Sequence, residues 1–181
     1  MTPKLDHTSL HRTAKYFMDN GTASSHDEAL DLLKSFGLTI YVGDEIAESV
    51  CHQNALLTLV NVARRTFLGG VEVVGSLLME SVSPLAPNCT LDCAVKRLGG
   101  IVVSSSAKTW PAAVIGSAEV PQLSPVCLQL TWAGWSGGVV PAKDKFRLDE
   151  AHAMSIAPAL AAAVCAAELF SYFAGDNPLA G

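Results

Sequence analysis

The segment from Gln53 to Gly75 constrains the fold more than any other part of the chain. It reads QNALLTLVNVARRTFLGGVEVVG. The sequence predicts a helix from Gln53 to Phe67, a stop at Gly69-Gly70 and a short buried strand from Val71 to Val74. Apolar residues cover most of the helix circumference, so other elements must cover the helix on nearly all sides. This pattern indicates an α/β domain of Rossmann-like type.

The polar residues of this predicted helix form one narrow strip. Asn54, Thr58, Asn61 and Arg65 follow one another at intervals of four, three and four residues, which places them on one side. We expect this strip to face water or a partner. Arg64 and Arg65 could bind a phosphate or carboxylate, or could complement the helix dipole in the last turn. Arg65 is the stronger candidate because it belongs to the strip.

Two helices are predicted before the first strand. Asn20-Gly21 stops the first, and Ser25 caps the second, which runs from His26 to Phe36. Further predicted elements are the strands Leu38–Val42, Ile101–Val103 and Pro111–Gly116 and a short helix that Thr90 caps.

The later part of the chain changes character. The run VCLQLTW, Val126 to Trp132, alternates between two sets of side chains and predicts an antiparallel or edge strand. A turn and a returning strand follow, and then a helix from Ala159 to Phe173, with Ser155 as its cap and Gly175 after its end. The predicted fold is a mainly parallel sheet flanked by helices, with an added antiparallel hairpin. We expect one domain over 1–175, with helices in 1–37 and the α/β core in 38–175, and the start of a linker in 176–181.

Composition excludes several classes of protein. The net charge is −5 and the 12 Lys and Arg residues are scattered, which argues against nucleic-acid binding. No segment reaches the roughly 18 uncharged apolar residues of a membrane span. The nearest is Ile156 to Val164, which Pro158 interrupts. The N-terminus lacks the apolar core of a signal peptide, and the five cysteines suit reduced thiols, so we expect a cytoplasmic protein without membrane contact.

The turn after the first predicted strand lacks a phosphate-binding loop. Gly43-Asp44 stands where a dinucleotide-binding protein carries G-x-G-x-x-G, but that spacing is absent. Asp44, Glu45 and Glu48 would repel a pyrophosphate. We therefore predict no cofactor for this chain.

Two other groups of residues are candidates for chemistry. Cys89 and Cys93 lie around a helix cap, but no second ligand pair completes a zinc site, and no histidine follows nearby to activate Cys89. Trp132 and Trp135 in WAGWSGG could stack a base or clasp a peptide, or could cover the end of a sheet. Ordinary thiols and packing are the simpler interpretations, and we predict no metal.

The proportion of apolar residues predicts a buried interface. Half of the residues are hydrophobic and only 16% are charged. Monomers rarely expose contiguous apolar patches beyond a few hundred Å². We expect a homo- or hetero-oligomer, with the final alanine-rich helix as its first contact.

Several runs together resemble one known family. RTAKYFMDNG (12–21), QNALLTLVNVARRTFLGGVEV (53–73), TWAGWSGG (131–138) and the final helix are similar to the N-terminal region of bacterial ThiF-family proteins. Those proteins are relatives of ubiquitin-activating enzymes. In the longer members a Rossmann-like region precedes an ATP-binding adenylation domain.

The resemblance implies a catalytically degenerate partner or scaffold domain that is not catalytic in isolation. Its partner would be a ThiF-type adenylation domain, which would hold the ATP, or its own copy. Arg65, or Arg12 in the first helix, is a candidate to serve the active half, as in related two-domain enzymes. Two alternatives remain open: a stand-alone enzyme acting on a nucleotide or acyl substrate, and a dimerisation module.

Overall fold

A six-stranded sheet forms the centre of the protein. The computed structural model describes residues 11–121, 124–150 and 154–175. The strands are β1 (Gly37–Val42), β2 (Gly70–Val74), β3 (Ile101–Val103), β4 (Ala112–Ile115), β5 (Cys127–Ala133) and β6 (Ser136–Pro141). Their order is β3-β2-β1-β4-β5-β6, parallel from β3 to β5, with β6 antiparallel to β5. The predicted mainly parallel α/β sheet with an added hairpin is confirmed, and the order is that of a Rossmann-like fold.

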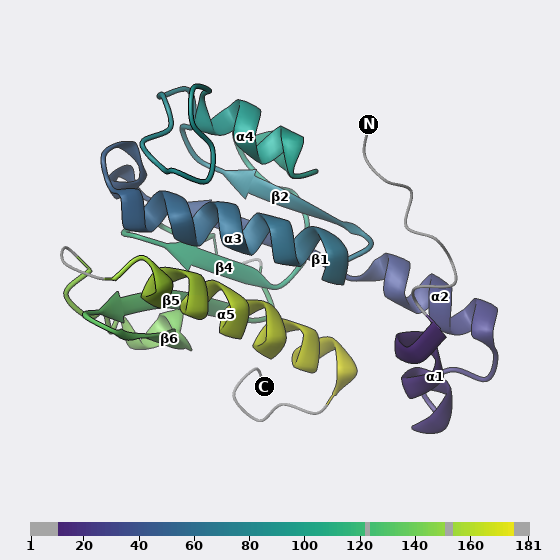
Figure 1. Ribbon diagram of the computed structural model, residues 1–181. Coiled ribbons are helices and arrows are strands. Elements are labelled where there is room, and N and C mark those ends of the chain that lie inside the picture. The colour runs from purple at the N-terminus through teal and green to yellow at the C-terminus, as the bar shows by residue number, and fades with distance from the viewer. Residues whose placement is uncertain (1–10, 122–123, 151–153, 176–181) are drawn as a thin grey trace.

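Three helices cover one face of this sheet. These are α3 (Val50–Thr66), α4 (Leu91–Arg97) and α5 (Ile156–Ala174), and α3 lies beside α5 across the middle of the sheet (Figure 1). Leu38 and Ile40 of β1 are fully buried on the side that faces the helices. The described parts of the connections after β3 and β4 contain no helix, so loops cover the opposite face. There Trp110 lies so close to Gly37 that a side chain at Gly37 would overlap its ring.

The polar strip of α3 differs from its prediction at its first residue. Asn61 and Arg65 are exposed and Thr58 is half-buried, but Asn54 is only 4% exposed. The loop 76–89 folds over the first half of α3, where Ser83 Oγ donates a hydrogen bond to Asn54 Oδ1. The strip therefore reaches the surface only along the last half of the helix.

Two helices precede the sheet, α1 (His11–Asp19) and α2 (His26–Ser35). Ser25 caps α2 as predicted, since its side chain accepts the N–H of Glu28. The two helices lie at one end of the molecule (Figure 1). They join the core through aromatic contacts, because Phe17 lies edge-on to Phe36 and Phe170.

β5 has the predicted antiparallel neighbour but is not an edge strand. β5 has an antiparallel partner, but it also pairs in parallel with β4 and is therefore interior, while β6 is the edge strand. The polar side chains of β5 are buried and satisfied. Gln129 Nε2 donates to the carbonyl oxygen of Gly116, at 3.2 Å, and Thr131 Oγ1 donates to Glu150 Oε1, at 3.0 Å. The alternation of polar and apolar side chains in β5 therefore reflects one polar and one apolar face, both of which are buried.

The last helix is longer than predicted and begins differently. Ser155 makes no capping hydrogen bond, because its own backbone is already helical. Gly175 ends the helix in the left-handed conformation, as predicted. Among the described residues, α5 is a helix long and apolar enough to cross a membrane by length and composition, and 39% of its apolar window is buried. Its buried residues pack beside α3 and over β5 and β6.

Candidate functional site

The carboxyl ends of β1 and β4 form the candidate site. These strands are neighbours, and the chain leaves them toward opposite halves of the sheet, to β2 after β1 and to β5 after β4. Ligands of open α/β sheets bind in the crevice outside the carboxyl ends of the strands at this topological switch point. Here the crevice lies between Gly43, which follows β1, and Gly116-Ser117, which follow β4.

A side chain of the protein itself occupies this crevice. Glu45, in the short 3-10 helix η2 (Asp44–Ala47), reaches Ser117, whose N–H and O–H donate to Glu45 Oε2 at 3.0 and 2.9 Å. A Cβ atom at Gly43 or at Gly116 would lie 2.5 Å from the same oxygen, so both glycines leave room for the carboxylate. Gly116 also has a φ of +77°, which favours glycine.

Hydrogen bonds stabilise the charged form of Glu45. Burial alone would raise its pKa, but the N–H of Ser117, its own N–H, the Ser117 hydroxyl and Arg147 outweigh burial and lower the pKa to about 2. Arg147 Nη1 lies 3.1 Å from Glu45 Oε1. The crevice therefore holds a carboxylate that is ionised at neutral pH.

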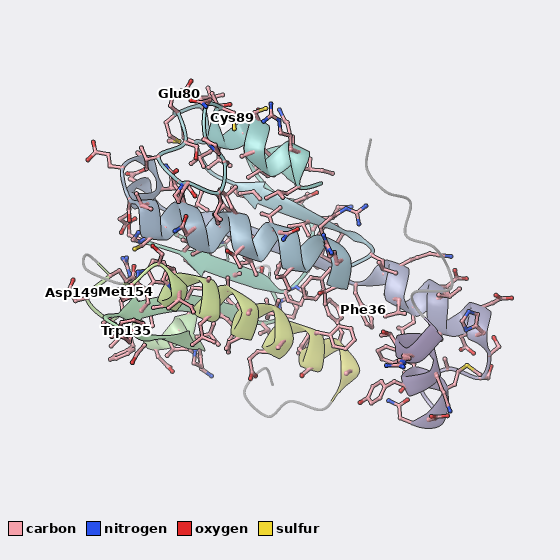
Figure 2. All side chains as sticks on the ribbon, in the orientation of Figure 1. Phe36, Glu80, Cys89, Trp135, Asp149 and Met154 are labelled. Carbon is pink, nitrogen blue, oxygen red and sulfur yellow. The ribbon has the colours of Figure 1, made fainter. Side chains whose placement is uncertain are left out.

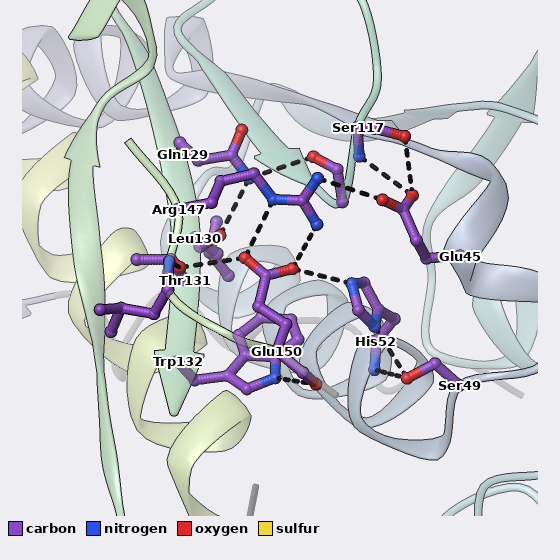
Figure 3. Close-up of polar contacts among 12 residues, drawn as sticks. Glu45, Ser49, His52, Ser117, Gln129, Leu130, Thr131, Trp132, Arg147 and Glu150 are labelled. Carbon is purple, nitrogen blue, oxygen red and sulfur yellow. Dashed lines mark hydrogen bonds and ion pairs between the residues drawn. The ribbon is translucent and has the colours of Figure 1, made fainter. Parts of the chain in front are cut away.

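Arg147 links Glu45 to a second carboxylate, which is buried (Figure 3). Arg147 Nε donates to Glu150 Oε1 at 3.1 Å, and Nη2 donates to Glu150 Oε2. The Glu150 side chain is 5% exposed. Burial opposes its ionisation, but bonds from His52, Arg147 and Thr131 lower its pKa. The hydrogen bond to Glu150 in turn raises the pKa of Arg147.

The network continues to the start of α3. His52 Nε2 lies 3.0 Å from Glu150 Oε2, and His52 Nδ1 lies 2.8 Å from Ser49 Oγ. Ser49 is the N-cap of α3, and the ring of His52 stands edge-on to Trp132. An ionised carboxylate only accepts hydrogen bonds, so Nε2 is the ring nitrogen that donates to Glu150.

Two hollows flank these residues. The larger holds about 670 Å³, and its lining includes Glu45, Glu48, Ser49, His52, Arg147 and Glu150. The smaller holds about 250 Å³, and its lining includes Tyr41, Gly43, Asp44, Gly75, Ser117 and Glu119. Carboxylates outnumber cations in both linings. Among the described residues, no group of three His, Cys, Asp or Glu side chains has the arrangement of a metal site.

The arginines predicted from the sequence lie away from this crevice. Arg64, Arg65 and Asn61 are in the last two turns of α3, and Arg12 is exposed on α1. A helix of 17 residues is about 25 Å long at about 1.5 Å per residue, and α3 begins at the site. Asn61, Arg64 and Arg65 therefore cannot reach the crevice. Arg12 lies beside Phe170 and Ala174 in the last turns of α5, so it too belongs to a different surface.

The two hairpin tryptophans are separated. Trp132 is fully buried and donates its indole N–H to the carbonyl oxygen of Glu150, at 3.3 Å. Trp135 is 73% exposed and lies near Met154 at the end of the hairpin (Figure 2). Met154 N–H donates to the carbonyl oxygen of Gly134. The two indoles therefore cannot hold a base or peptide between them, and only that of Trp135 is at the surface.

None of the five cysteines, all of which lie in the described ranges, forms a disulfide. Burial raises the pKa of Cys127 to about 11 and raises that of fully buried Cys165. Cys89 is half-buried and donates to the carbonyl oxygen of Ala86 at 3.6 Å. No described contact supplies the base that a nucleophilic Cys89 would need.

Sequence reasoning did not bring Ser117, Arg147 and Glu150 to the site. Glu45 and Glu150 are 105 positions apart, and no local sequence pattern indicates that Arg147 pairs with both. The one usable signal was the turn Gly43-Asp44-Glu45, which was interpreted as repulsive to phosphate. Glu45 does not only repel a phosphate, because its own carboxylate occupies the position that the phosphate would take.

Comparisons with known proteins gave two matches. The model of the BilD N-terminal domain family matches residues 37–181, starting at the first residue of β1. The bacterial E1-like protein BilD of Collimonas sp. (strain OK412) is 55% identical over 181 residues, which is all of this chain and 39% of that protein. The chain thus spans about two fifths of the length of this curated relative. No solved structure matches.

Proposed function

Because this chain belongs to the family of BilD N-terminal domains, we propose that it is a catalytically degenerate partner domain of an E1-like protein. It acts beside a ThiF-type adenylating domain, which binds ATP, and it contributes surface and scaffold to that domain. The two domains share one polypeptide or meet as separate chains. The free thiols support a reducing, cytoplasmic location.

The occupied crevice is the observation that carries this proposal. Dinucleotide-binding Rossmann domains place a glycine-rich loop and a helix N-terminus at this point, so that backbone N–H groups face the pyrophosphate. In this chain the Ser117 N–H and Arg147 are engaged by Glu45 instead. Asp44 and Glu48 add negative charge on either side. A nucleotide would have to displace an ionised carboxylate from its partners.

Calorimetric titration of this chain with magnesium-ATP tests whether it has lost nucleotide binding. We expect no binding at ATP concentrations up to the millimolar range. The adenylating domain of the same E1-like protein serves as the positive control. Micromolar binding to this chain alone would contradict the proposal.

The partner role has a separate test. The chain and the adenylating domain, produced as separate polypeptides, should co-elute as a complex in size-exclusion chromatography. If ATP turnover by the adenylating domain falls without this chain, its scaffold role is supported. If both turnover and elution are unchanged by mixing, the chain is not a partner domain.

A second candidate function rests on Ser49, His52 and Glu150. A hydroxyl, an imidazole and a carboxylate in hydrogen-bonded series are the parts of a nucleophilic relay, and they line the 670 Å³ hollow. In this reading the Ser49 oxygen attacks an acyl carbonyl, and His52 takes the proton and returns it to the departing alcohol or thiol. Water then releases the acid from Ser49.

A fluorophosphonate probe distinguishes this candidate from helix capping. A nucleophilic Ser49 would form a P–O bond and expel fluoride, and mass spectrometry would find the label on the peptide that contains Ser49. Ser49→Asn keeps a capping side chain but lacks the hydroxyl, so it controls for folding. An unlabelled wild-type chain would leave Ser49 as the cap of α3.

A further inference from the structure

We propose that the crevice between Gly43 and Ser117 is an anion-binding site whose resident occupant is Glu45, so that removing this carboxylate opens the site to a free phosphate. This inference rests on the proposed function, since it names the residue that closes the degenerate site. The chemical class of the ligand is a tetrahedral oxyanion, either inorganic phosphate or a phosphoryl group.

The donors around Glu45 are those that bind an anion. Ser117 supplies a backbone N–H and a hydroxyl, and Arg147 supplies a guanidinium nitrogen, all within 3.1 Å of a Glu45 oxygen. Charge-assisted bonds from arginine and from backbone N–H groups are the usual contacts of a bound phosphate. The low pKa of about 2 for Glu45 shows that these donors favour a negative charge.

The two glycines beside Glu45 carry no side chain that would close the crevice. A Cβ atom at Gly43, just after β1, or at Gly116, just after β4, would lie 2.5 Å from Glu45 Oε2. Gly43 and Ser117 also line the hollow of about 250 Å³, and Glu45 and Arg147 line the hollow of about 670 Å³. Once the Glu45 side chain is cut back, the space between two glycines and the adjoining hollow admits an anion.

Two observations indicate that phosphate binds weakly to the opened site. Asp44 and Glu119 line the same hollow, and their charges oppose a second anion. Arg147 also remains paired with Glu150 when Glu45 is removed. We therefore expect the opened site to bind phosphate in the millimolar range.

The experiment compares Glu45→Ala with matched variants of the same chain. Titration of inorganic phosphate at constant ionic strength, followed by the amide NMR signals of Gly43 and Ser117, should saturate for Glu45→Ala. The wild-type chain and Glu48→Ala should show no saturating shift, because in both the Glu45 carboxylate stays in place. Glu48→Ala controls for the loss of one negative charge in the same turn.

Further variants identify the donors. Glu45→Gln keeps a side chain of the same shape in the crevice, so we expect it to fold and to bind at least tenfold more weakly than Glu45→Ala. Adding Ser117→Ala to Glu45→Ala removes the hydroxyl donor and should weaken phosphate binding severalfold. Equal binding by Glu45→Ala and the wild-type chain would overturn the proposal.

Thermal unfolding tests the proposal even if Glu45→Ala is less stable than the wild-type chain. Phosphate should raise the Tm of Glu45→Ala and Glu45→Ser more than chloride at equal ionic strength, because a ligand stabilises the folded state that binds it. If neither variant responds to phosphate, the crevice is not an anion site, while the degenerate-partner proposal still stands. ATP binding by the wild-type chain would instead contradict that proposal.

Discussion

At the scale of single residues, Arg147 joins the two halves of the sheet. It pairs with Glu45, which follows β1, and with Glu150, which lies near the ends of β5 and α3. Glu150 is nearly fully buried, so its charge depends on Arg147 and on the bonds from Thr131 and His52. Losing one partner of a buried carboxylate leaves that charge uncompensated.

Replacing Arg147 should therefore destabilise the fold. We expect Arg147→Met to lower the free energy of unfolding by about 2–3 kcal/mol, the range for hydrogen bonds to a charged group. Arg147→Lys keeps the charge but loses the fork of donors, and should fall between wild type and Arg147→Met. Urea unfolding measures both. A loss below about 0.5 kcal/mol for Arg147→Met would show that the ion pairs are not formed in solution.

Glu45 and Glu150 also predict how stability depends on pH. Both carboxyl pKa values are lower in the folded protein, so their stabilisation is complete above the ordinary carboxyl value of 4.5. It is lost as pH falls from about 4.5 toward the folded value, which is about 2 for Glu45. Thermal melts between pH 6 and pH 3 should show a falling Tm. The fall should be smaller in Glu45→Gln, and equal slopes would contradict the low pKa.

Arg65 should act at a surface and not in the core. It is exposed in the last turn of α3, so Arg65→Ala should change stability by no more than about 1 kcal/mol, the scale of a helix-terminus charge. We expect weaker association with the adenylating domain, measured by calorimetry, with Arg12→Ala as a second exposed variant. A large loss of stability with unchanged association would make Arg65 a structural cap.

At the scale of elements, Gln53 of α3 holds the loop 76–89 together with Asn54. Gln53 is fully buried, and its Oε1 accepts the N–H groups of Val82 and Ser83 at 2.8 and 3.0 Å. Its Nε2 donates to the carbonyl oxygen of Ile46. The amide thus links η2, which carries Glu45, to the loop 76–89.

Gln53→Met should loosen both segments. The side chain keeps its length, but the N–H of Val82 and the carbonyl of Ile46 lose their hydrogen bonds to the amide, at a cost of about 1–3 kcal/mol. Hydrogen exchange should rise in 76–89. Asn61→Met, on the exposed part of the same helix, serves as the control and should change neither quantity. Unchanged exchange in Gln53→Met would show that the loop does not depend on this amide.

At the scale of the whole molecule, the outer side of α5 is apolar and exposed. Ile156 and Leu160 are 64% and 47% exposed, and Ala163 and Ala167 continue the same side. Trp135 and Met154 stand nearby at the end of the hairpin (Figure 2). This surface corresponds to the interface predicted from the composition, and oligomerisation remains a prediction.

Light scattering tests that prediction. The chain alone should show a dimer or concentration-dependent self-association at high micromolar concentration. Leu160→Lys should weaken it by placing a charge in the apolar side of α5, whereas Leu78→Lys, at an exposed loop position, should not. A clean monomer at all concentrations would rule out self-association of this chain.

The sequence by itself determined the elements and their class. Apolar periodicity located α3, the glycines after it fixed its end, and β-branched runs predicted the strands, because these signals act between residues a few positions apart. The hairpin and the missing glycine loop followed from equally local patterns. The comparisons agree with the resemblance as far as an E1-like protein.

The tertiary structure alone decided the strand order, the burial of Asn54 and the site. Strand order brought Gly43 beside Ser117 and made β5 an interior strand, neither of which periodicity encodes. Glu45 meets Arg147 and Glu150 because the connection after β1 and the connection between β6 and α5 lie at the same end of the sheet. Side chains so far apart in the chain interact only once the sheet has closed that distance, so local sequence carries no signal of their contact.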